Sequence, residues 1–122
     1  MKKKYHAHVY FRLSEVPLAQ ALLKAIEALY SPEVQIGQFH LRPVGPHPVP
    51  MVTLEFDSEI KEDFIQFLIR NRESLTILIH EDTGDDYYDH SEGAQWLGEK
   101  LQLNFDHFER IKYDKSALVF PE

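Results

Sequence analysis

The sequence contains no cysteine, and this absence restricts the chemistry open to the protein. Disulfide bonds, zinc–thiolate sites, iron–sulfur clusters and cysteine nucleophiles are all excluded. A metal ion bound by this chain must therefore be held by nitrogen and oxygen atoms, the donors that histidine, aspartate and glutamate supply.

Long apolar runs and clustered basic residues are also scarce. No stretch approaches the roughly 18–20 apolar residues of a membrane span, and the three lysines at residues 2–4 precede no hydrophobic signal region. Acidic residues outnumber basic ones by 20 to 13, a formal net charge of −7, which argues against a phosphate backbone as partner. We expect a cytoplasmic protein that binds neither nucleic acid nor membrane.

The length and the hydropathy pattern predict one domain over residues 1–122, of α+β class. Apolar residues alternate with polar ones in four predicted strands, residues 5–11, 34–42, 51–56 and 75–80. Helical periodicity follows Ser14 and again follows Asp57 or Ser58, which are the predicted caps. The order β-α-β-β-α-β predicts a ferredoxin-like fold, in which two helices cover one face of an antiparallel four-stranded sheet. Gly37 interrupts the second strand and predicts a bulge.

Histidines gather at one end of this predicted sheet. On a strand, His6 and His8 point to the same side, about 6.5–7 Å apart. If the first strand lies between the third and fourth, His80 and Glu55 lie beside them on the face that no helix covers. Such a set suits a mononuclear site with open positions, as non-haem Fe(II) oxygenases require, and zinc or manganese would also fit. The alternatives are solvated histidines, an exposed glutamate, and a strand-end histidine bonded to a loop carbonyl.

His47 lies in a loop, residues 43–50, that four prolines and one glycine keep stiff. We expect this stiffness to position the imidazole as a further ligand or as a general acid or base. The third strand starts at the far end of the first strand. His47 therefore reaches His6 and His8 only if its loop folds back or comes from a partner subunit.

Weaker patterns supply further candidates. Residues 81–90 hold five acids and end in His90, which faces either the sheet or solvent; Asp85 or Asp86 predicts a short helix running towards Trp96. Arg42 is a substrate-binding candidate, because its guanidinium can pair with a carboxylate, although an ion pair with nearby acids is the alternative. Tyr10 is a second such candidate, by stacking on an aromatic ligand, against core or interface packing.

Several short segments also form an ordered set with characteristic intervals. They are residues 5–11 (YHAHVYF), 45–48 (GPHP), His80 with residues 83–86 (TGDD), 89–90 (DH) and 96–98 (WLG). Together they resemble the DOPA 4,5-dioxygenase family. Glu81 departs from the family, which commonly has proline after the histidine that matches His80, and this bears on the acidic loop and on substrate preference.

The resemblance implies an extradiol dioxygenase that opens a catechol such as DOPA beside its two hydroxyls. It also implies a non-haem metal, with Fe(II) first among divalent ions, and dioxygen as co-substrate. The matching histidines are His6, His8, His47, His80 and His90, and which three bind metal stays open. We assign metal ligation to His6, His8 and His80, and proton transfer to His47 and His90.

Two other functions stay open. A non-catalytic small-molecule-binding or regulatory ferredoxin-like dimer would bind a ligand without turnover. A cofactor-independent isomerase or monooxygenase would keep its activity after chelation. We also expect a homodimer, because Tyr10, Met51 and Leu78 lie on the sheet face that the predicted helices leave uncovered.

Overall fold

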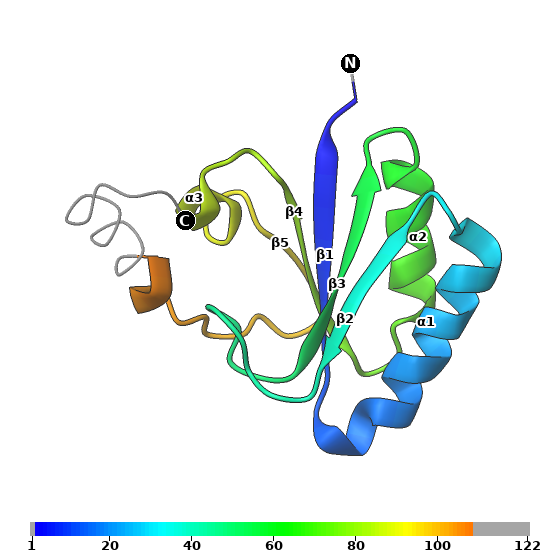
Figure 1. The fold of residues 1–122 in the computed structure, drawn as a ribbon, viewed down its shortest axis with the longest axis horizontal. Helices are drawn as coiled ribbons and strands as arrows, with labels where there is room; N and C mark the ends of the chain where they lie inside the picture. Colours follow the sequence, from blue (N-terminus) through cyan, green and yellow to red (C-terminus); the bar gives the residue numbers. More distant parts are fainter. Residues whose placement is uncertain (1, 109–122) are drawn as a thin grey trace.

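The computed structural model describes residues 2–108. Its strands are β1 (Lys4–Tyr10), β2 (Gln35–His40), β3 (Met51–Asp57), β4 (Thr76–Glu81) and β5 (Gln95–Leu97). Its helices are η1 (Leu13–Glu15), α1 (Val16–Tyr30), α2 (Lys61–Asn71) and α3 (Asp86–Asp89). The predicted α+β class is confirmed, with one antiparallel sheet in the order β2-β3-β1-β4-β5 (Figure 1).

The sheet has five strands where the sequence predicted four. β5 pairs with the outer edge of β4, with Trp96 opposite Leu78. The helix predicted to run towards Trp96 is a single turn, α3, which Asp85 caps by accepting a hydrogen bond from the Tyr88 backbone N–H. Three residues are too few to show an alternating pattern, so β5 could not be recognised as a strand from the sequence.

Helices α1 and α2 cover one face of the sheet, as predicted (Figure 1). α1 buries Leu22 and Ile26, and α2 buries Phe64 and Leu68, against alternate residues of β1, β3 and β4. Both helices start later than the predicted caps, since η1 precedes α1 and a turn at Asp57 precedes α2. Within residues 2–108, none of the helices combines the length and the hydropathy needed to cross a bilayer.

The opposite face is covered by the chain itself. Tyr10, Met51 and Leu78 are at most 2% exposed, and they pack with Leu103 against side chains from the loop after β2 and the segment after β5. Both segments lie on the side away from the helices (Figure 1). The reason given for a homodimer, an uncovered apolar face, is therefore wrong, while the homodimer itself stays a prediction.

The bulge predicted at Gly37 is present, because the register between β2 and β3 shifts between Ile36 and Phe39. A Cβ atom at Gly37 would lie 3.0 Å from the carbonyl oxygen of Thr53. Glycine therefore lets β2 approach β3 closely at the residue that faces His8. β2 ends at His40, so Arg42 lies in the following loop rather than on the strand.

Candidate metal centre

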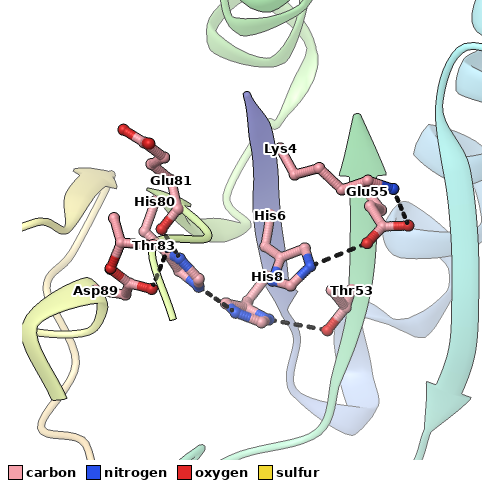
Figure 2. Close-up of polar contacts among 9 residues, drawn as sticks. All are labelled: Lys4, His6, His8, Thr53, Glu55, His80, Glu81, Thr83 and Asp89. Atoms are coloured by element: carbon pink, nitrogen blue, oxygen red, sulfur yellow. Dashed lines mark hydrogen bonds and ion pairs between the residues drawn. The ribbon is translucent and has the colours of Figure 1, made fainter. Parts of the chain in front are cut away.

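The central strand β1 places two histidines beside a third. His6 lies opposite His80 of β4 on one side and opposite Glu55 of β3 on the other, as the strand order predicted. The three imidazoles point to the same face of the sheet, where Figure 2 shows them side by side. The Nε2 atoms of His8 and His80 are 3.0 Å apart. With metal–nitrogen bonds of about 2.1 Å, neighbouring ligand atoms of one ion lie about 3.0–3.4 Å apart, so this spacing fits two ligands of a single metal.

His47 joins this group from the loop between β2 and β3. Its ring centroid is 4.4 Å from that of His8, so the loop does fold back and no partner subunit is needed to bring the two together. The backbone N–H of Asn104 donates to the carbonyl oxygen of Pro46 at 2.8 Å, which ties the loop to the segment after β5. The stiff loop is thus anchored by a part of the chain more than fifty residues away.

His90 completes the group from the end of α3, with its ring centroid 4.5 Å from that of His80 and 5.4 Å from that of His8. The buried carboxylate of Asp89 accepts hydrogen bonds from the backbone N–H of Thr83 at 3.0 Å and from the Thr83 hydroxyl at 2.6 Å. These bonds close the acidic stretch into a fixed loop and hold His90 towards the sheet. All five predicted histidines therefore converge.

The five imidazoles differ in exposure, and burial controls their charge. His8, His47, His80 and His90 are each at most 8% exposed, whereas the His6 side chain is 25% exposed. Burial lowers the pKa of His8 well below its usual value, and repulsion from the surrounding imidazoles lowers it further. Burial likewise lowers the pKa of His47 to about 3 and is the main cause of the lowered pKa values of His80 and His90. These four rings are neutral at pH 7, the form in which imidazole binds a metal.

Hydrogen bonds fix which nitrogen of His80 and His90 carries the proton. The Nδ1–H of His80 donates to the Glu81 carbonyl oxygen at 2.9 Å, and that of His90 donates to the Asp86 carbonyl oxygen at 2.8 Å. A carbonyl oxygen only accepts, so the Nε2 atom of each ring is unprotonated and carries a lone pair. This arrangement is typical of histidines that bind metals.

Two overlapping sets of histidines in residues 2–108 have ligand atoms within 4.8 Å of one another. The first set is His6, His8 and His80, and the second is His8, His47 and His90. His8 belongs to both, and its Nδ1 lies 2.8 Å from the Thr53 hydroxyl (Figure 2). Imidazole nitrogens grouped in this way, all but those of His6 buried, fit a divalent metal ion.

Glu55 contributes to the candidate metal centre through its contact with His6. Its carboxylate accepts a hydrogen bond from His6 Nε2 at 3.3 Å and lies 3.7 Å from the Lys4 ammonium (Figure 2). The proton on Nε2 leaves the lone pair of His6 on Nδ1. Glu55 therefore orients a histidine in this structure.

The two substrate-binding candidates occupy different environments. Tyr10 is 2% exposed, its ring stacks on Trp96 with centroids 6.0 Å apart, and its hydroxyl lies 2.7 Å from Nδ1 of His47. Burial raises the pKa of its hydroxyl above the usual range. Arg42 is exposed in the loop after β2. Their roles in substrate binding stay predictions.

The model of the Dopa 4,5-dioxygenase family matches residues 5–107, a range that includes every histidine described above. The chain belongs to this family. The resemblance inferred from the ordered motifs is thereby confirmed.

Individual relatives extend this result. The DOPA 4,5-dioxygenase of Amanita muscaria is 29% identical over 126 residues, covering 98% of this chain and 55% of that protein. An uncharacterized 21.2 kDa protein of Botryotinia fuckeliana is 37% identical over 94 residues, covering 70% and 51%. The chain thus spans about half the length of these relatives. A crystal structure from Nostoc punctiforme, described as a candidate dioxygenase, matches with a TM-score of 0.85 at 35% identity, covering 89% of this chain and 93% of that one.

Two residues that position histidines in this Dopa 4,5-dioxygenase family chain were not predicted from the sequence. Thr53 shares the face of Glu55 in the alternation of β3, which was a usable signal for a partner of His8. Asp89 gave no such signal, because it looked like one more solvated acid in an acidic stretch. Its burial depends on the contact with Thr83.

Proposed function

We propose that this protein is a non-haem, metal-dependent extradiol dioxygenase that opens the ring of a catechol such as DOPA. The observation that carries the proposal is the convergence of five imidazoles on one sheet face, four of them buried, in a chain of the Dopa 4,5-dioxygenase family. A merely solvated set of histidines would not be buried, and buried imidazoles with free lone pairs suit metal ligation.

We assign the metal to His6, His8 and His80, the first of the two sets. Three nitrogen ligands leave open positions, and among the divalent metals that fit these donors the dioxygenase chemistry of the family favours Fe(II). When bound, the ion would supply Lewis acidity and a common template for catechol and dioxygen.

His47 and His90 are assigned to proton handling, because both lie against His8 without belonging to the first set. A catechol must lose a hydroxyl proton to become an electron-rich anion, and a positioned imidazole can take or return such a proton. His90 has its Nε2 lone pair free for this purpose. The buried Tyr10 lies beside this group, and the half-buried Trp96 stacks on its ring.

A direct assay tests the function. Metal-free protein loaded anaerobically with Fe(II) and a catechol is expected to give a yellow ring-opened semialdehyde once oxygen is admitted, with one O₂ consumed per product. A chelator added before the metal should prevent this reaction. Ligand binding without oxygen uptake, for several catechols, would leave only the binding-module alternative, and activity that survives chelation would favour a cofactor-independent enzyme.

The Thr53 hydroxyl offers a milder test of the same centre. Thr53→Val keeps the shape of the side chain on β3 but removes the partner of His8 Nδ1, so metal affinity is expected to fall about tenfold. Titration of the metal-free protein with Zn(II) or Fe(II) measures this change. Thr76→Val, on β4 and opposite Tyr10, is the matched control and should bind as the wild type does.

A further inference from the structure

A buried hydrogen bond joins Tyr10 to His47. The Tyr10 hydroxyl lies 2.7 Å from His47 Nδ1, and the two residues are 2% and 7% exposed. Stacking on Trp96 holds the tyrosine ring, and the anchored loop holds the histidine. The pair therefore has a fixed geometry, in which either Tyr10 or His47 donates the hydrogen bond.

The single proton of the Tyr10 hydroxyl determines the direction of this hydrogen bond. If His47 Nδ1 carried a proton and donated it, the hydroxyl would need a second group to accept its own proton. Among the residues that the structure describes, His47 is the hydrogen-bond partner that this hydroxyl has. A buried donor left without an acceptor is costly, whereas donation from Tyr10 to Nδ1 satisfies both groups.

We propose that Tyr10 is a positioning residue that donates its hydrogen bond to Nδ1 of His47 and so fixes the proton of this imidazole on Nε2. In that tautomer both nitrogens are committed, one to Tyr10 and one to its own proton. His47 then has no lone pair to give a metal ion and acts as a hydrogen-bond donor.

This arrangement is the reverse of that at the neighbouring rings. His80 and His90 donate from Nδ1 to backbone carbonyls and keep their lone pairs on Nε2. The second set, His8 with His47 and His90, is thus one ligand short, whereas His80 in the first set keeps its lone pair on Nε2. The roles of these two histidines rest on the proposed function. His90 accepts a proton, whereas the N–H of His47 is available to donate a hydrogen bond to an anionic oxygen of the substrate.

Imidazole ¹⁵N NMR of the metal-free protein at neutral pH tests the tautomers without any turnover. We expect His47 as the Nε2–H form, and His80 and His90 as the Nδ1–H form. In Tyr10→Phe, His47 should shift towards a mixture of tautomers while His80 and His90 keep theirs. A wild-type His47 in the Nδ1–H form would overturn the proposal.

Titration of the same samples with Zn(II), which is diamagnetic, tests the ligand set. The nitrogen signals of His6, His8 and His80 are expected to move to positions typical of bound nitrogen, while His47 keeps its protonated Nε2. Direct zinc binding by His47 would also overturn the proposal.

Turnover provides a separate readout. Tyr10→Phe is expected to lower kcat for a catechol roughly 10–100-fold with little change in KM or zinc affinity, since the hydroxyl acts through His47. Tyr5→Phe is the matched control, because Tyr5 lies on the same strand but stacks on Phe56 in the other core. Wild-type kcat in Tyr10→Phe would count against the role. If no catechol is cleaved by the wild type while the tautomers are as stated, the proposed function fails and the tautomer assignment stands.

Discussion

Replacing His8 with alanine is expected to lower metal affinity and catechol turnover by more than about a hundredfold, above the range usual for residues that only support a ligand. His8 is the residue common to both sets of converging imidazoles, and its Nε2 lies 3.0 Å from that of His80. Of the members of the two sets, His8 alone belongs to both. Metal content after desalting and oxygen uptake with a catechol measure the two losses.

His40→Ala is the matched control for this experiment. His40 ends β2 and belongs to neither set, so its removal should leave metal affinity and turnover within about twofold of the wild type. Circular dichroism should show both variants folded. Full metal binding by a folded His8→Ala protein would contradict the assignment of the centre.

Lowering the pH from 7 to 5 is expected to destabilise the metal-free protein by about 2 kcal/mol through His47 alone. The pKa of His47 is about 3 in the folded state and about 6.5 in the unfolded chain. Between about pH 3 and pH 6.5, His47 is protonated in the unfolded state but stays neutral in the folded state. Stability is therefore complete above pH 6.5 and falls as the pH drops, by about 1.4 kcal/mol per unit. The pKa of His8 is shifted in the same direction and adds to the loss.

Urea denaturation in the presence of a chelator, at pH 7 and at pH 5, measures this effect. His47→Gln keeps a polar partner for the Tyr10 hydroxyl but cannot titrate, so its stability should fall by about 2 kcal/mol less than that of the wild type. His40→Gln should retain most of the pH dependence, because repulsion from His40 is the smallest of the causes that lower the pKa of His47. Equal stability of the wild type at the two pH values would show that the buried imidazoles titrate normally.

The part of the centre that lies on paired strands was predictable from the sequence. Alternation places His6 and His8 on one face of β1, and antiparallel pairing then fixes Glu55 and His80 as their neighbours. These inferences need only the period of a strand and the strand order. They are correct because a shift of one residue would bury the polar face and expose the apolar one.

The part that depends on loops was not predictable in the same way. The position of His47 depends on the bond from Asn104 to Pro46, and that of His90 depends on Asp89 meeting Thr83. Such contacts join residues of loops, which have no strand or helix periodicity, so a local sequence pattern cannot predict them. The covering of Tyr10 and its neighbours has the same origin, which is why the argument for a homodimer failed.

The central position of β1 has a consequence for how the centre comes into being during folding. His8 and His80 are brought together only when strands separated by some seventy residues of chain have paired. A partly assembled chain has no such centre, and long-range pairing of this kind forms late and slowly. An ion that binds these imidazoles would therefore bind the folded protein and not the unfolded chain. A higher concentration of the ion in the cell would then shift the folding equilibrium of newly made chains towards the folded state.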